Sequence, residues 1–168
     1  MIMYARQFLL AAPLLGSLLV PTSGLAAEAE LVMDAESGEI LFEKNAETAR
    51  APAGLAKLMT LYLAFEAVTE GHLSMDDQVH ISANAATEPP VVLGLTEVDT
   101  LTLRYLVRAT AVGGANDAAT ALAEAVAGSE PEFVDMMNTK AEALGMTGSH
   151  FTNAHGLGSR PIDFSPVS

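Results

Sequence analysis

Cysteine is absent from this chain of 168 residues. Its absence excludes disulfide bonds, catalysis by a thiol and metal sites built from thiolates. Basic residues are scarce: eight lysines and arginines stand against 21 acids, so the formal net charge is −13. This balance argues against nucleic acid and against an anionic membrane surface as partners. It does not select a substrate, because most such charge lies on a solvated face.

The first 27 residues lack acids, and Arg6 is their only charged residue. Their apolar run, Phe8 to Val20, is shorter than the roughly 20 residues that a membrane-spanning helix needs. Small residues follow at Gly24 and Ala26, at the spacing that a signal peptidase accepts. We therefore predict a secretory signal peptide over residues 1–27, no transmembrane anchor after its cleavage, and a location in the bacterial periplasm. A short buried helix is the alternative interpretation of this segment.

The rest of the chain predicts an α+β fold, with short strands followed by several helices. Residues 31–34 and 39–42 are strand candidates around a turn that ends at Gly38. Apolar spacing and helix-start signals then predict a strand over 79–81 and helices over 55–70, 101–111, 117–127 and 129–144. In the first helix, the apolar positions that fall at helical spacing are Leu55, Leu58, Met59, Tyr62, Ala64 and Phe65.

The start of the first helix carries a lysine but no hydroxyl. Lys57 lies three residues after Gly54, on the same face of the helix. A serine at position 54 would form a compact pair of nucleophile and base, and the positive end of the helix dipole would favour an oxyanion. Glycine has no side chain that can attack a substrate. No serine in the chain has a lysine three residues after it, so no substitute pair of this kind is predicted.

Four segments of the chain carry motifs in a characteristic order. The first is Asp-Ala-Glu-Ser-Gly-Glu-Ile-Leu at 34–41, and the second is Ala-Pro-Ala-Gly-Leu-Ala-Lys-Leu-Met-Thr at 51–60. The third is Gly-Ala-Asn-Asp-Ala-Ala at 114–119, and the fourth, at 145–157, contains Gly-Met, His-Phe and Asn-Ala-His-Gly-Leu. Together they resemble the low-molecular-mass penicillin-binding proteins, which are D-alanyl-D-alanine carboxypeptidases of the serine β-lactamase-like superfamily.

The resemblance implies a fold and an activity. The fold is a truncated domain of the β-lactamase and transpeptidase type over residues 28–157, with a helical cluster against an incomplete antiparallel sheet and an irregular tail over 158–168. The activity is that of an exported enzyme that removes the terminal D-alanine of the peptidoglycan stem pentapeptide through an acyl-serine intermediate. The partner implied is therefore the peptidoglycan stem peptide.

The resemblance also assigns positions to the reaction. Gly54 occupies the nucleophile position and Lys57 the general-base position, while Gly114 occupies the position of a second serine and Asn116 that of the group that binds the substrate amide. From the sequence, Asn116 is also expected at the N-cap of the helix over 117–127.

The chain departs from the family pattern in three places. Gly54 cannot be acylated, Gly114 cannot relay a proton, and no lysine of the chain begins a Lys-Thr-Gly element. We therefore predict a catalytically inactive homologue. The four histidines lack metal-binding spacing, so neither a metal nor a cofactor is expected.

Three alternatives stay open at this stage. In the first, the physiological protein is an active carboxypeptidase, and this sequence is an altered or truncated form of it. In the second, the chain is a non-catalytic periplasmic fragment that binds peptidoglycan or another protein. In the third, the chain does not fold stably, since a hairpin without neighbouring strands is marginal on its own.

Overall fold

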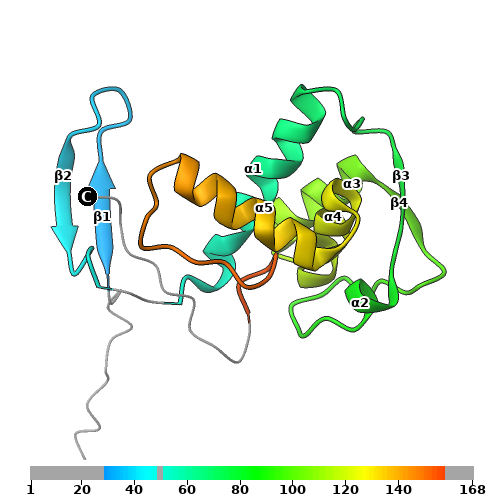
Figure 1. Cartoon of the computed structure of the whole chain (residues 1–168). Helices are drawn as coiled ribbons and strands as arrows, with labels where there is room; N and C mark the ends of the chain where they lie inside the picture. Colours follow the sequence, from blue (N-terminus) through cyan, green and yellow to red (C-terminus); the bar gives the residue numbers. More distant parts are fainter. Residues whose placement is uncertain (1–28, 49–50, 158–168) are drawn as a thin grey trace, which may run out of the picture.

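Two stretches of the chain, residues 29–48 and 51–157, are described by the computed structural model in Figure 1. They form two small antiparallel sheets and a group of packed helices, which confirms the predicted mixture of helices and strands. The predicted signal peptide (1–27) and tail (158–168) lie outside the described residues. Within the described ranges, no helix is both long enough and apolar enough to cross a membrane.

Strands β1 (Glu30–Met33) and β2 (Ile40–Lys44) form the predicted hairpin. Its turn is fixed by Asp34, whose Oδ1 accepts a hydrogen bond from the backbone amide of Ser37 at 2.7 Å. The turn closes at Gly38, whose φ of +75° favours glycine. The hairpin stands to one side of the helices (Figure 1). Its apolar side chains are about half exposed, and they are Leu31, Val32, Met33, Ile40, Leu41 and Phe42.

Helix α1 (Ala56–Thr69) follows directly on a short 3₁₀-helix, η1 (Ala53–Leu55). Sequence spacing predicted its packed side only in part. Of the six apolar positions, Met59 and Ala64 are buried, but four are 46–65% exposed: Leu55, Leu58, Tyr62 and Phe65. The buried side is completed by Ala56, Leu63 and Ala67. Apolar residues surround most of this helix, so periodicity alone does not identify the side that packs.

Helix α4 lies among the other helices and contacts α1, α3 and α5. Its alanines at 118, 119, 121 and 123 are fully buried, and such small side chains let neighbouring helices approach closely. The larger side chains between the helices include Leu103, Leu106, Leu122, Phe133 and Met137. The bounds of this group are α3 (Leu103–Arg108), the π-helical turn η2 (Ala109–Gly113), α4 (Asn116–Ala127) and α5 (Glu130–Ala143).

The second sheet pairs β3 (Gln78–His80) with β4 (Thr100–Thr102), and the short helix α2 (Ala83–Ala86) follows β3. The strand predicted over 79–81 is thus confirmed to within one residue. The helix predicted from residue 101 begins later, because its first residues pair with β3 instead. Thr102 then caps α3, since its Oγ1 accepts a hydrogen bond from the backbone amide of Tyr105 at 3.3 Å.

Candidate functional site

Gly54 and Lys57 lie where the chain enters α1. Gly54 is exposed in η1, and a Cβ atom added there would meet no atom within 4 Å. Lys57 is on the first turn of α1 and only 7% exposed. Its Nζ donates a hydrogen bond to the backbone carbonyl of His155 at 3.0 Å. Burial lowers the pKa of the Lys57 amine, because a desolvated ammonium is disfavoured.

Gly114 ends η2 in the left-handed region, with a φ of +66°. This conformation suits glycine and turns the chain from η2 into α4. A serine at this position would meet no neighbouring atom within 4 Å at its Cβ, but its backbone would be strained. Gly114 therefore has a conformational reason to be glycine, whereas Gly54 has a φ outside this region.

Asn116 is fully buried at the start of α4, and its predicted role as the N-cap is wrong. The N-cap is Ala115, which forms no side-chain hydrogen bond with the helix. Asn116 is instead the first helical residue, and its Nδ2 donates to the carbonyl of Pro89 at 2.7 Å. This bond fixes the orientation of the amide, since only the nitrogen can donate. The Oδ1 atom of Asn116 has no hydrogen-bond partner among the described residues.

The elements that carry the predicted site residues pack together, because α1 contacts both η2 and α4. Lys57 and Asn116 are fastened to different loops, however. Lys57 holds the segment 153–157 through the carbonyl of His155, and Asn116 holds the loop that follows Glu88 through the carbonyl of Pro89. These two loops are therefore tied to neighbouring helices.

Asp117 fixes the second of these loops and was not singled out from the sequence. It is 1% exposed, and its carboxylate accepts hydrogen bonds from the backbone amides of Leu93, Gly94 and Leu95 at 2.9, 3.0 and 3.1 Å. A buried carboxylate with three backbone donors is well satisfied. The loop is thereby clamped to the first turn of α4, beside Asn116.

The segment 153–157 is pressed against the start of α1. Thr60 Oγ1 donates a hydrogen bond to the carbonyl of Ala154 at 2.6 Å. Gly156 has a φ of +79°, and a Cβ atom on it would collide with the backbone of Ala53 and the side chain of Ala56. Only glycine allows so close an approach of two backbones. The segment therefore forms a wall beside Gly54 and Lys57.

Glu88, Glu130 and His155 form a cluster that sequence reasoning missed, in which His155 is buried and the two glutamates are partly buried. His155 Nε2 lies 3.0 Å from Glu88 Oε2, and the two side chains are 6% and 8% exposed. Burial raises the pKa of Glu88, with the carboxylates of Glu130, Glu124 and Asp117 adding to the effect. Burial also lowers the pKa of His155. The three residues are 25 or more positions apart in the sequence, so no local spacing signals the cluster.

The same three residues offer carboxylate oxygens and an imidazole nitrogen within 4.8 Å of one another. Atoms of these kinds bind metal ions in proteins. Each of these side chains already has hydrogen-bond partners in the structure. The carboxylate of Glu130 accepts from the backbone amide of Ala154 at 3.0 Å and from Asn84 Nδ2 at 3.2 Å. The arrangement is thus internally satisfied.

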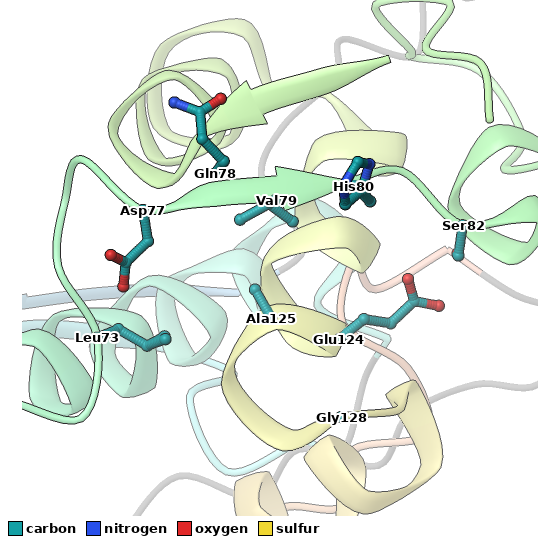
Figure 2. Close-up of a pocket in the computed structure, with 9 residues that line it drawn as sticks. All are labelled: Leu73, Asp77, Gln78, Val79, His80, Ser82, Glu124, Ala125 and Gly128. Atoms are coloured by element: carbon teal, nitrogen blue, oxygen red, sulfur yellow. The ribbon is translucent and has the colours of Figure 1, made fainter. Parts of the chain in front are cut away.

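A hollow of about 660 Å³ lies between β3 and α4, outside the predicted site residues (Figure 2). Its carboxylates are engaged in local hydrogen bonds: Asp77 Oδ2 accepts from the amide of Ser74 at 2.7 Å, and Glu124 Oε1 accepts from Asn84 Nδ2 at 3.1 Å. The other lining residues are Leu73, Gln78, Val79, His80, Ser82, Ala125 and Gly128. The hollow shows no catalytic arrangement of its own.

Comparison with known proteins identifies the family. The family model of the D-alanyl-D-alanine carboxypeptidases, peptidase family S11, matches residues 19–163, and the chain belongs to this family. The D-alanyl-D-alanine carboxypeptidase DacF of Bacillus subtilis is 37% identical over 138 residues, which cover 81% of this chain and 36% of that protein. The chain thus spans about a third of the length of the curated relatives it matches.

Solved structures give the same result. The D-alanyl-D-alanine carboxypeptidase DacD from Francisella tularensis superposes with a TM-score of 0.79 at 34% identity, over 96% of this chain and 37% of that one. Penicillin-binding protein D2 from Listeria monocytogenes, solved in its cefotaxime-bound form, superposes with a TM-score of 0.73 at 32% identity, over 86% and 59% of the two chains. The predicted family and fold type are therefore confirmed.

Proposed function

We propose that this chain binds peptidoglycan stem peptides that end in D-alanyl-D-alanine, but forms no acyl-enzyme with them. Membership of the D-alanyl-D-alanine carboxypeptidase family supports a role in peptidoglycan metabolism. The observation that carries the proposal is the contrast at the start of α1. Lys57 is retained, buried and hydrogen-bonded, whereas Gly54 has no oxygen atom to acylate.

The absence of a nucleophile at position 54 supports the proposed lack of catalysis. In subtilisin, removal of the nucleophilic serine lowers kcat by about 10⁶-fold. In this proposal Gly114 compounds the loss, because it supplies no second hydroxyl. These effects do not add, since the residues of such a site act as a unit. The first of them is sufficient to abolish acyl transfer.

Retained binding is supported by the buried amide of Asn116. Its Oδ1 is an acceptor without a partner among the described residues, and a buried unsatisfied acceptor costs about 1–3 kcal/mol. Asn116 is 0% exposed, and the loop that follows Glu88 is bonded to it through the carbonyls of Pro89 and Val91. Binding therefore requires this loop to move aside, after which an N–H group of a peptide ligand would satisfy Oδ1. In this proposal, Asn116 holds a substrate amide while Lys57 stabilises the wall of the site.

A titration followed by two-dimensional amide NMR tests binding directly. The ¹⁵N-labelled chain is titrated with a synthetic peptide ending in D-alanyl-D-alanine, and with the same peptide ending in L-alanyl-L-alanine as the control ligand. We expect shifts at residues 89–95 and 114–117 with the first peptide and none with the second. Asn116→Leu is the matched variant, because it keeps about the size of the side chain but removes the Oδ1 acceptor, and the shifts with the first peptide should be lost in it. Equal shifts with both peptides, or none with either, contradict the proposal.

Export to the periplasm is a further part of the proposal. It is supported by the acid-free N-terminal sequence with its 13-residue apolar run. Expression of the full chain in a Gram-negative host, followed by N-terminal sequencing of the periplasmic fraction, tests it. A mature N-terminus near residue 27 or 28 is expected, and recovery of the uncleaved chain in the cytoplasm contradicts it.

An active carboxypeptidase is the second candidate for the natural protein. It is favoured by one observation, the open space around Gly54, where an added Cβ atom would meet no atom within 4 Å. Penicillin labelling of a Gly54→Ser variant tests this candidate. A labelled variant supports it, because the rest of the site would then accept an acyl group.

A further inference from the structure

The pairing of Glu88 and His155 fixes which nitrogen of the imidazole ring carries the proton. His155 Nδ1 accepts a hydrogen bond from the backbone amide of Leu157 at 3.1 Å. Because that amide can only donate, Nδ1 carries no hydrogen, and in the neutral ring the proton lies on Nε2. Nε2 faces Glu88 Oε2 at 3.0 Å and donates to it. The geometry thus defines one neutral tautomer.

Glu88 is held in turn by a second donor. Its Oε1 accepts a hydrogen bond from Thr120 Oγ1 at 2.9 Å, and Thr120 is fully buried on α4. The charged groups around the pair come from several elements. Glu130, Glu124 and Asp117 act on Glu88. Both Glu130 and Lys57 act on His155, where Glu130 favours the charged imidazole and Lys57 disfavours it. Protonation of Nδ1 would also set two donors against each other at Leu157, which disfavours the charged imidazole.

The backbone of the same histidine holds the lysine. His155 donates through its ring to Glu88, and its carbonyl accepts from Lys57 Nζ at 3.0 Å. We propose that Glu88 is a positioning residue for Lys57: it fixes the imidazole of His155, and the carbonyl of His155 fixes the lysine amine. This inference rests on the proposed function in that it takes Lys57 to belong to the binding site, but its test needs no ligand.

A metal ion is a weaker explanation of the cluster. Coordination by His155 Nε2 would require the proton to move to Nδ1, where it would break the hydrogen bond from Leu157. It would also replace the hydrogen bonds that Glu88 accepts from Thr120 and His155. The hydrogen bonds account for every oxygen and nitrogen of the pair without an ion.

The proposal is tested by the pH profile of lysine modification. The intact chain is treated with a small amine-reactive reagent across a pH series, and modification of each lysine is followed by peptide mass spectrometry. Lys57 is expected to react with a midpoint pH below the ordinary lysine value of 10.5, because burial favours its neutral amine. In Glu88→Ala, the segment 153–157 loosens, and the midpoint for Lys57 moves up towards that ordinary value.

Glu88→Gln is the conservative variant that separates positioning from bulk stability. Its amide oxygen accepts from His155 and its amide nitrogen donates to Thr120, so the midpoint for Lys57 stays at the wild-type value. Hydrogen exchange of the Leu157 amide gives a second readout. It quickens about tenfold or more in Glu88→Ala, as expected when a partly buried donor loses its acceptor, and it stays near wild type in Glu88→Gln.

Several results would overturn the proposal. One is an unchanged Lys57 midpoint in Glu88→Ala that is folded by circular dichroism. If that variant is unfolded, Thr120→Val replaces it, with a smaller shift expected in the same direction; no shift would again overturn the proposal. Imidazole ¹⁵N NMR that places the proton of His155 on Nδ1, or a one-to-one response of that ring to Zn²⁺, would do so as well. All these readouts are independent of stem-peptide binding, so a failure here is distinct from a failure of the proposed function.

Discussion

The two ends of the described chain differ sharply in how they are held. The segment 153–157 is tied to α1 by Lys57 and Thr60 and to α5 by Glu130. The β1–β2 hairpin is held by its own strand pairing and its turn, and its apolar side chains stay about half exposed. The candidate site is therefore built from the helices and their loops rather than from the hairpin.

The largest expected effect comes from matched phenylalanines in the two regions. Phe133 on α5 is fully buried, whereas Phe42 on β2 is 49% exposed. Phe133→Ala should lower the free energy of unfolding by about 3–5 kcal/mol, and Phe42→Ala by about 1 kcal/mol. Urea unfolding measures both. Similar losses in the two variants would show that the hairpin is as integral to the fold as the helices.

The next effect comes from two glycines with positive φ. Gly156→Ala strains the backbone and drives a Cβ into Ala53, so we expect a loss of about 2–4 kcal/mol in the free energy of unfolding. Gly38→Ala has the same kind of strain but open space around the new atom, and about 1 kcal/mol should be lost. If Gly156→Ala is as stable as Gly38→Ala, the segment 153–157 does not pack against the start of α1 as closely as described.

A third prediction concerns pH. The pKa of Glu88 is raised in the folded chain, so its contribution favours folding below its ordinary value of 4.5 and is lost as the pH rises through the raised value. The pKa of His155 is lowered, so its contribution is present above 6.5 and is lost as the pH falls below that. Glu88→Gln removes the first contribution alone.

The stability of Glu88→Gln relative to wild type should therefore rise as the pH increases above 4.5. Urea unfolding of both chains at a series of pH values measures this difference. Asp99→Asn is a control at an exposed site, where the pKa is lowered by hydrogen bonds from Thr96, so its pH dependence has the opposite sign. A flat difference for Glu88→Gln would mean that Glu88 is not buried as described.

The smallest effect is expected at Gly54, and Gly114 is its comparison at the other glycine of the predicted active-site positions. Gly54→Ser meets open space and should change the free energy of unfolding by no more than about 0.5 kcal/mol. Gly114→Ser must adopt a φ of +66° and should lose about 1–2 kcal/mol. Thermal unfolding of the two variants compares them. A large loss in Gly54→Ser would show that this position does not accept a serine.

Local signals predicted much of the fold. Ser129 was expected to start a helix, and its Oγ accepts a hydrogen bond from the amide of Glu132 at the start of α5. The turn at Gly38 was predicted in the same way. The packed side of α1 was predicted poorly, because Leu58 and Tyr62 are apolar yet exposed. Periodicity identifies a packed side only when the opposite side is polar.

The candidate site was also predicted only in part, because local sequence patterns do not show which distant residues meet. The motifs around Lys57 and Asn116 identified the elements that meet, but the capping role of Asn116 was wrong because its amide bonds to a distant loop. The pair of Glu88 and His155 joins residues that are 67 positions apart. Neither residue has a local pattern around it that indicates a partner, so tertiary contact was needed to find the pair.

We propose that no acyl group forms on this chain, and intact-mass spectrometry is the sharpest test of this proposal. After prolonged incubation with a β-lactam such as cefotaxime, the account predicts an unchanged mass for the wild-type chain. Penicillin-binding protein D2 from Listeria monocytogenes, whose structure was solved in a cefotaxime-bound form, serves as the positive control. A mass increase equal to one β-lactam molecule on the wild-type chain would contradict the account.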